Sequence, residues 1–238
     1  MTDERPEDKT RHSSASDADL ISDPDERAAR EAKNGLRQID AVVEIVEHYI
    51  ETGRPFRLRV STLLHLHRIA LDGISAYAGN FRPAGIEIGG SKHQPMGAHL
   101  VPGSVEEMCD YVNEHWDSSS ALHLAAYTLW RLNWIHPFTD GNGRTARATS
   151  YLALCVRLRY PIYAPNSIPE QIAQDKTPYY SALEAADVAC AAGRLDVSIL
   201  EELLDTLLAR QLYSVLRDAR GPAGGEFNSG LKLPPSSR

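Results

Sequence analysis

Apolar residues recur along most of this chain at steps of three and four positions, the spacing at which one face of an α-helix is buried. The clearest stripe predicts an amphipathic helix that starts near Pro24 and ends at the turn Gly53-Arg54-Pro55. Its apolar members are Leu36, Ile39, Val42, Val43, Val46 and Ile50. Further helices are expected over residues 61–71, 104–116, 120–135, 142–158, 169–174, 179–192 and 197–217.

One region departs from the helical pattern. Residues 79–83, Gly-Asn-Phe-Arg-Pro, form a turn cluster. Beyond it, Ile86 and Ile88 alternate with polar or small neighbours before Gly89-Gly90, and such alternation predicts a short hairpin arm. The expected fold class is therefore mostly α, a helical bundle with one short β-hairpin.

The two ends of the chain differ in composition from its middle. Residues 1–24 are polar, acidic and rich in Ser and Asp, a composition typical of disordered segments. The stretch from Gly221 onward is rich in Gly, Pro and Ser. We therefore expect one helical domain over residues 25–217, between a disordered N-terminal tail and a flexible C-terminal tail at 218–238.

Composition and charge disfavour several classes of protein. The 238 residues carry a net charge of −7, which disfavours a surface built for nucleic acid. No apolar run approaches the roughly 18–20 residues of a membrane span, and the charged start is unlike a secretory signal. Cys109, Cys155 and Cys190 are widely spaced, as buried thiols in a reducing compartment are, so we expect a cytoplasmic protein. His65 and His67 are interpreted as helix-surface or core-edge groups.

Candidate chemistry is concentrated in residues 136–147, His-Pro-Phe-Thr-Asp-Gly-Asn-Gly-Arg-Thr-Ala-Arg. His136 is expected at a helix end, because a proline disfavours α geometry in the residue before it. Gly141-Asn142-Gly143 opens the next helix, where backbone amides and the helix dipole suit phosphate oxygens. The segment thus joins a residue that titrates near neutral pH to an anion nest.

The charged residues of the same segment fit a polyanion that carries a metal. Arg144 and Arg147 are three residues apart on one helix face, so both can contact the same phosphates. Asp140 beside them would be repelled by phosphates unless a cation bridged the two, and Mg²⁺ does this with few protein ligands. The loop therefore offers a base, a metal ligand, an anion nest and two phosphate clamps.

This segment resembles the signature of the Fic domain family, HPFx(D/E)GNGRxxR, at every specified position. The resemblance continues outside the signature and covers roughly residues 30–210. Residues 79–82 look like the family's GxFR element, the stretch from Ile86 to Pro95 looks like its flap, and Tyr179-Tyr180 with Leu183 look like its nucleotide-side helix.

The resemblance implies a protein adenylyltransferase. His136 would take the proton from a Ser, Thr or Tyr hydroxyl of a target protein, whose oxygen attacks the α-phosphate of ATP while pyrophosphate leaves. By similarity, Asp140 holds Mg²⁺, Arg144 contacts the β-phosphate and Arg147 the γ-phosphate. The anion hole would be formed by Gly141, Asn142 and Gly143.

The flanking elements receive roles in the same way. Ile86, Glu87 and Ile88 would lie on a flap that pairs with an extended segment of the target. Tyr179 and Tyr180 would line the adenine side of the site, or else serve in packing. Phe138 would anchor the loop in the core.

Regulation is where the match departs from the family. Many Fic proteins carry an inhibitory helix, (S/T)xxxE(G/N), whose glutamate pairs with the second motif arginine. In the counterpart at residues 30–35, Asn34 fits the last position but Lys33 occupies the glutamate's place. Three alternatives follow: no restraint of this kind, substitution by Glu31 in a shifted register, or restraint by a separate antitoxin protein of a toxin-like enzyme. We expect the N-terminal helix to cover the ATP site without strong inhibition.

Other functions compete with this one. The same site could transfer UMP, GMP, phosphocholine or phosphate, although the intact GNGR favours nucleotide transfer. A non-catalytic module that binds partner proteins is disfavoured by the intact His136. A DNA-binding regulator is disfavoured by the acidic balance of the chain. The target and the oligomeric state are left open, a homodimer included.

Overall fold

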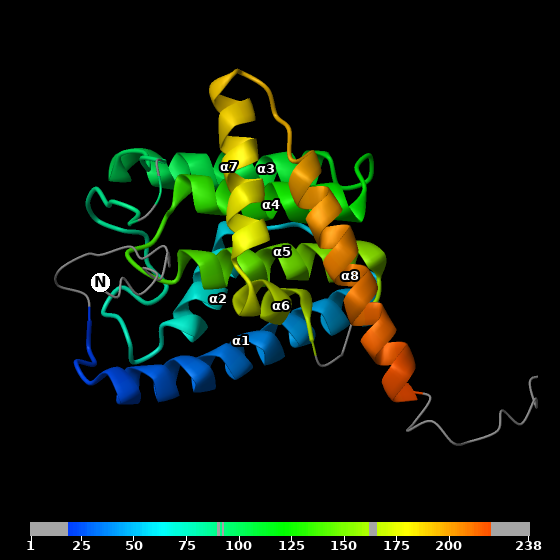
Figure 1. Cartoon of the computed structure of the whole chain (residues 1–238), viewed down its shortest axis with the longest axis horizontal. Helices are drawn as coiled ribbons and strands as arrows, with labels where there is room; N and C mark the ends of the chain where they lie inside the picture. The colour runs from blue at the N-terminus through cyan, green and yellow to red at the C-terminus, as the bar shows by residue number, and fades with distance from the viewer. Residues whose placement is uncertain (1–18, 90, 92, 162–165, 220–238) are drawn as a thin grey trace, which may run out of the picture.

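The computed structural model describes residues 19–89, 91, 93–161 and 166–219. Within those ranges the protein is a bundle of eight α-helices, which confirms the mostly α class (Figure 1). The helices are α1 Pro24–Thr52, α2 Val60–Ala70, α3 Val101–Glu114, α4 Ala121–Ile135, α5 Asn142–Leu158, α6 Ile168–Gln174, α7 Thr177–Ala191 and α8 Ser198–Ala219, with a short 3-10 helix, η1, at Ala98–Leu100. None of them is both long and apolar enough to cross a bilayer.

The longest helix, α1, begins and ends where its residue types favour a boundary. Asp23 caps it, because its carboxylate accepts from the backbone N–H groups of Asp25 and Glu26 at 2.9 and 2.8 Å. Gly53 ends it in the left-handed conformation at φ 61°. The start at Pro24 agrees with the predicted one.

The segment before α1 lies against the bundle. Asp19 forms a single antiparallel bridge with Ser75, and the Leu20 N–H donates to the carbonyl of Ile74 at 2.8 Å. Residues 19–23 of the expected disordered tail are therefore ordered on the fold. Residues 1–18 and 220–238, where the rest of the two predicted tails falls, lie outside the described residues.

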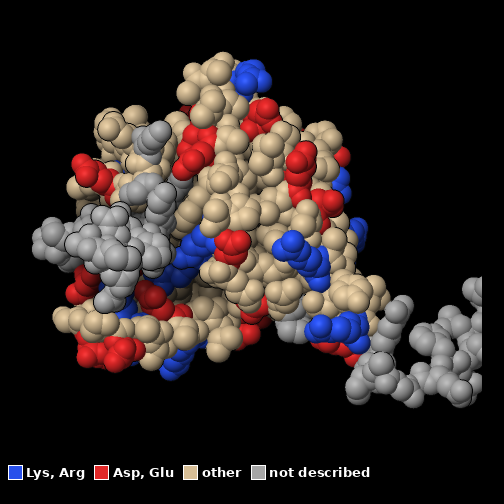
Figure 2. Space-filling model, viewed as in Figure 1, with Lys and Arg blue, Asp and Glu red and all other residues tan. Residues whose placement is uncertain are grey.

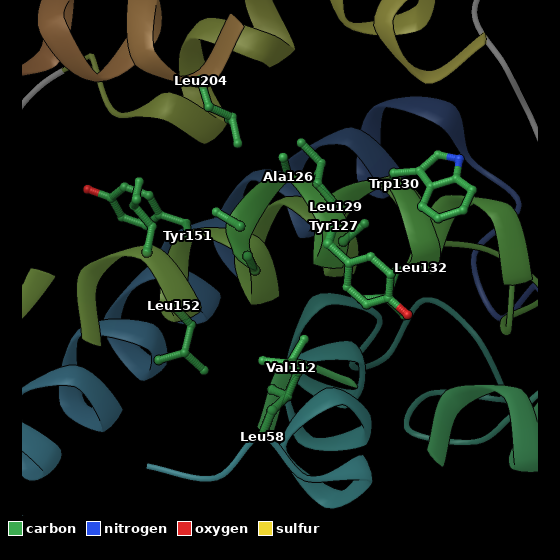
Figure 3. Packing of buried hydrophobic residues seen from close by; sticks show 14 of the residues in the cluster. Leu58, Val112, Ala126, Tyr127, Leu129, Trp130, Leu132, Tyr151, Leu152 and Leu204 are labelled. Carbon is green, nitrogen blue, oxygen red and sulfur yellow. The ribbon is translucent and has the colours of Figure 1, made fainter. Parts of the chain in front are cut away.

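The core is organised around α5, which runs through the middle of the bundle against α4, α1 and α2 (Figure 1). Of its 17 residues, 12 are buried. Several of these are small, which lets the neighbouring helices approach closely: Thr145, Ala146, Ala148, Thr149, Ser150 and Ala153. Figure 3 shows the apolar packing around Leu129 and Leu132 of α4 and Leu152 of α5, none of them more than 1% exposed. The amino end of α5 is thereby held at a fixed place.

The predicted hairpin is not present as a strand pair in the described part of residues 83–95; Gly90 and Lys92 lie outside it. Ile88 is a lone bridge residue, and the Ser91 N–H donates to its carbonyl at 3.2 Å, which makes a turn. Carbonyls on both sides of this turn accept from one side chain instead of a partner strand. The Arg82 guanidinium donates to the carbonyls of Ala84 and Met96.

Candidate functional site

The loop between α4 and α5 places His136. This residue ends α4 in the left-handed conformation at φ 51°, and its N–H donates to the Leu132 carbonyl at 3.0 Å. Its ring Nδ1 lies 3.2 Å from the carbonyl of Asn133. A carbonyl only accepts, so this contact selects the tautomer with the proton on Nδ1 and the lone pair on Nε2. Such an imidazole can act as a base, and His136 lines the main cavity.

Gly141 opens α5 at a position that admits no side chain. Its φ is +72°, and a Cβ there would lie 2.3 Å from Leu71 Cδ2. Gly141 also accepts the first helical bond, from the Thr145 N–H at 2.9 Å. The N–H groups of the first turn, at Asn142 and Gly143, therefore have no acceptor within the helix and are suited to an anion.

The side chain of Asn142 holds the loop. Its Oδ1 accepts from the Phe138 N–H at 2.9 Å, and its Nδ2 donates to the Phe138 carbonyl at 2.8 Å. Both ends of the amide are thus used within the loop, which leaves the backbone N–H of Asn142 for the predicted anion hole. Phe138 is fully buried, as its predicted anchoring role requires.

His67 of α2 packs against the loop and holds it in place, a role that the sequence analysis missed. Its ring stacks on Phe138 at 3.7 Å between centroids. Its Nδ1 accepts from the Gly79 N–H and its Nε2 donates to the Asp140 carbonyl, each at 3.0 Å. Burial lowers the pKa of His67 to about 4. The signal was present, because Leu63, Leu66, His67 and Ala70 form one buried helix stripe.

Arg82 supports the same loop from the other side. Its Nε donates to the His136 carbonyl at 2.8 Å and its N–H to the Pro137 carbonyl at 2.9 Å. The side chain is 3% exposed, and burial lowers its pKa from the ordinary arginine value. The resemblance named residues 79–82 as an element without giving it a role. The structure shows that this element fixes the backbone that carries His136.

A cavity of about 470 Å³ brings most of the predicted site residues together. Its lining includes His136, Asp140, Arg144, Arg147, Tyr179 and Tyr180. Figure 2 shows basic side chains beside acidic ones in the hollow between α1, along the lower edge of the view, and the body of the bundle. The volume lies within the usual range for small-molecule sites.

The two motif arginines differ in their partners. Arg144 is paired with Asp140 at 3.0 Å and with Glu31 at 3.3 Å. Arg147, half-buried, has no carboxylate partner among the described residues. Burial lowers its pKa from the ordinary arginine value, Tyr179 raises it and Arg144 lowers it further. A partly enclosed guanidinium of this kind is stabilised by any anion that enters the cavity.

The remaining predicted residues are divided between lining and packing. Tyr179 is 2% exposed and belongs to the core, although it also borders the cavity, and the half-buried Tyr180 contacts it at 5.5 Å between ring centroids. On the expected flap, Ile88 is buried in the cavity lining, while Ile86 is half-buried and Glu87 exposed. Ile88 therefore forms part of the cavity wall.

The predicted regulatory positions on α1 lie away from the cavity. Lys33 is exposed, and Asn34 is buried with its Nδ2 donating to the carbonyls of Ala70 and Asp72. Glu31 is the α1 carboxylate that lines the cavity. It pairs with the first motif arginine, Arg144, and not with the second. This contact differs from the one that the shifted register predicts, which is a pairing of Glu31 with Arg147.

Asp140 is the candidate metal ligand, with a side chain 30% exposed. Its Oδ2 lies 2.9 Å from a guanidinium nitrogen of Arg27 and 3.0 Å from one of Arg144, so this oxygen faces cations already. Among the described residues, no group of three His, Cys, Asp or Glu could hold a metal alone. A single carboxylate beside an anion site fits Mg²⁺, which is bound mainly through phosphate oxygens and water.

A family model matches the part of the chain that builds this site. The description of that model is the Fic/DOC family, and the match covers residues 57–154, from before α2 to within α5. This part of the chain is a Fic/DOC family domain. The first turns of α1, with Arg27 and Glu31, lie outside the matched range.

Relatives and solved structures agree with this assignment. A protein adenylyltransferase Fic of Drosophila persimilis is 33% identical over 132 residues, which are 55% of this chain and 24% of the relative. The chain thus spans about a quarter of that relative's length. A Fic domain containing signaling protein of Bacteroides thetaiotaomicron superposes with a TM-score of 0.61 at 22% identity, over 81% of this chain and 74% of that one. A Fic family protein of Desulfovibrio desulfuricans superposes with a TM-score of 0.58 at 19% identity, over 85% of this chain and 57% of that one.

The buried His67 predicts a pH dependence of stability. Its folded pKa of about 4 lies below the ordinary value of 6.5, so the unfolded chain binds the proton first as pH falls. The free energy of unfolding should therefore fall by about 3 kcal/mol through this group between pH 6.5 and 4. His67→Gln, which keeps a donor and an acceptor, should lose this component in urea unfolding followed at several pH values. His65→Gln on the exposed face should retain it; equal profiles for the two variants would contradict the prediction.

The Fic loop also predicts an unequal cost of adding a methyl group to two glycines. Gly141→Ala combines positive φ with a collision against Leu71 and should lower the free energy of unfolding by at least about 2 kcal/mol. Gly193→Ala has a similar φ of +73° but open space around it, so it should cost only about 1 kcal/mol. Chemical denaturation of both variants checks this, and equal costs would show that the contact with Leu71 relaxes freely.

Proposed function

We propose that this chain is a protein adenylyltransferase, which transfers AMP from ATP to a Ser, Thr or Tyr hydroxyl of a target protein and releases pyrophosphate. The observation that carries the proposal is Arg147. This half-buried side chain has no carboxylate partner among the described residues, and it lines the same cavity as His136 and the amino end of α5. A triphosphate supplies the negative charge that this arrangement lacks.

The acceptor half of the reaction is assigned to His136. The loop holds its ring in the tautomer whose Nε2 carries the lone pair. Nε2 takes the proton of the target hydroxyl as the oxygen attacks the α-phosphate. A positioned base of this kind typically contributes about 10²–10⁴-fold to the rate. Because His67 and Arg82 fix the backbone on both sides, the ring is placed before the substrates arrive.

The phosphate half is assigned to the start of α5. The first-turn N–H groups and Arg147 bind phosphate oxygens, and Arg144 joins them once its present partners are displaced. Asp140 would hold Mg²⁺, which when bound neutralises part of the phosphate charge. Positioning and charge neutralisation are the main requirements of phosphoryl and nucleotidyl transfer, and these residues supply both.

The nucleoside and the target are assigned to the other walls of the cavity. Tyr180 is partly exposed in the lining and offers a ring for the adenine, whereas Tyr179 mainly holds it in place. The exposed backbone around Ile86 and Glu87 lies next to Ile88 at the cavity and is proposed to dock an extended segment of the target. The unit that acts is the domain of residues 25–217, and its cytoplasmic location, oligomeric state and antitoxin partner stay predictions.

The test of the function is a labelling experiment. Purified protein is incubated with labelled ATP, Mg²⁺ and a cell lysate, and the labelled band is identified by mass spectrometry. The expected adduct on a hydroxyl side chain has the mass of AMP. Adducts of the mass of UMP, GMP or phosphate would instead identify another transferase of the same site.

Substitution of His136 separates catalysis from binding. His136→Ala should lower transfer by about 10²–10⁴-fold, because the proton acceptor is lost, while ATP binding measured by calorimetry stays close to the wild-type value. His65→Ala, an exposed histidine of α2 outside this cavity, is the matched control and should retain full activity. Transfer that survives in His136→Ala would refute the proposed base.

A further inference from the structure

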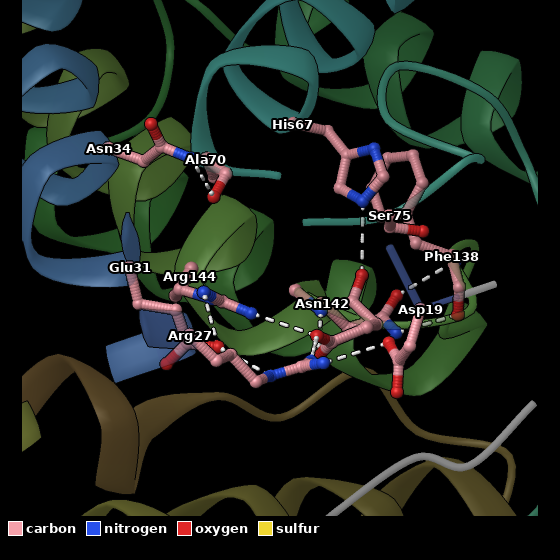
Figure 4. A network of polar contacts seen from close by, with 12 residues as sticks. Asp19, Arg27, Glu31, Asn34, His67, Ala70, Ser75, Phe138, Asn142 and Arg144 are labelled. Atoms are coloured by element: carbon pink, nitrogen blue, oxygen red, sulfur yellow. Dashed lines mark hydrogen bonds and ion pairs between the residues drawn. The ribbon is translucent and has the colours of Figure 1, made fainter. Parts of the chain in front are cut away.

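A cation of the chain itself lies in front of the candidate metal ligand. The guanidinium of Arg27, in the first turns of α1, is 2.9 Å from Asp140 Oδ2 and comes from a position 113 residues earlier in the chain (Figure 4). The same oxygen accepts from Arg144 at 3.0 Å. The carboxylate proposed to bind Mg²⁺ thus has two cationic neighbours in the nucleotide-free protein.

Arg27 is held in this place by contacts outside the loop. Asp19 pairs with it at 2.8 Å, and Glu31 one helical turn later pairs with it at 3.2 Å. The hydrogen bond that Arg27 donates to Asp19 is the main cause that raises the pKa of Arg27, so the charge of Arg27 is constant. Asp19 is itself fastened to the bundle through its bridge to Ser75. The position of Arg27 is therefore built by the fold and does not depend on Asp140 alone.

Glu31 makes the complementary contact. Its carboxylate pairs with Arg144 at 3.3 Å, at the residue assigned to a phosphate of the nucleotide. The start of α1 thus presents a cation to the ligand of the metal and an anion to the ligand of the phosphate (Figure 4). The two charges have the signs that a metal ion and a phosphate would bring to the same two residues.

We propose that Arg27 stands in for the metal ion in the resting protein, and that the nucleotide binds with Mg²⁺ only when Arg27 leaves Asp140. This inference rests on the proposed function, because it concerns the same metal and nucleotide. A guanidinium and a divalent cation repel each other, and here both would compete for Asp140 Oδ2. Arg27 therefore sets how much Mg²⁺ the protein needs.

The ion pairs of Arg27 and Glu31 with the loop can compete with Mg²⁺ and nucleotide, and they can also be displaced by them. The side chains of Arg27, Asp140, Glu31 and Arg144 are between 24% and 37% exposed, so water screens their ion pairs. Arg27 and Glu31 belong to the first turns of α1, where a helix end can separate from the bundle without loss of the core. We therefore expect a shift in metal dependence of about tenfold rather than complete inhibition.

The test measures nucleotide binding and not activity. Isothermal titration calorimetry with a non-hydrolysable ATP analogue is performed over a range of Mg²⁺ concentrations. Arg27→Gln should lower the Mg²⁺ concentration for half-maximal binding by about tenfold. Arg30→Gln is the matched control, since Arg30 is an exposed arginine of the same helix, and it should behave as the wild type. Thermal melting verifies that each variant is folded.

The same titration distinguishes the alternatives. If Arg27 were a direct phosphate ligand, Arg27→Gln would weaken binding with and without Mg²⁺, and the inference would be overturned. An unchanged Mg²⁺ dependence would overturn it too, while nucleotide binding itself would leave the proposed function standing. Absence of nucleotide binding in every variant would overturn the proposed function and the inference with it.

A second variant tests the mechanism without altering the cavity. Asp19→Asn removes the charge that anchors Arg27 and leaves Asp140, Glu31 and Arg144 unchanged. It should shift the Mg²⁺ dependence in the same direction as Arg27→Gln, by about twofold to threefold, since one partly exposed ion pair contributes little. A shift in the opposite direction would contradict the role assigned to Asp19.

Discussion

The site depends on one requirement, which is that the amino end of α5 stays open toward the cavity while the loop before it is closed by hydrogen bonds. First-turn N–H groups have no acceptor in their own helix, and a loop that folded over them would remove the anion nest. Gly141 permits the open geometry, because its φ is positive and because Leu71 fills the space that a side chain would need. The loop's own backbone groups are then bonded by side chains from behind, through His67, Arg82 and Asn142.

This arrangement separates the groups that hold the loop from the groups that face the ligand. His67 and Arg82 are 0% and 3% exposed and donate only to backbone carbonyls of the loop or of adjoining segments. His136 and Arg147 border the cavity. A substitution in the first pair changes the chemistry only by moving the loop, and a substitution in the second changes it directly. The different effects of His67→Gln and His136→Ala follow from this division.

The fold and the centre of the site could be predicted from the sequence because both are local. The range 142–158 is the observed α5, and residues 136–147 carry their chemistry in consecutive positions. The contacts that the sequence did not reveal join distant segments. Arg27 meets Asp140 across 113 residues, and no periodicity in either segment indicates that pairing. The expected hairpin is not seen among the described residues, and the sequence pattern did not indicate that Arg82 would donate to the carbonyls of Ala84 and Met96 on either side of it.

The chain has a net charge of −7 and yet has a cavity lined by several arginines. Charged residues of α1 help to neutralise this cavity from within the protein. Arg144 is neutralised by Asp140 and Glu31, and Asp140 by Arg27, so most of the site is balanced within the protein. Arg147 is the motif arginine left over among the described residues. Under the proposed function, a triphosphate would first pair with Arg147, and its phosphates and Mg²⁺ would then take the places of Glu31 and Arg27. Each exchange would replace one ion pair by another with the same signs, so the nucleotide could enter although Arg27, Glu31, Asp140 and Arg144 are already paired.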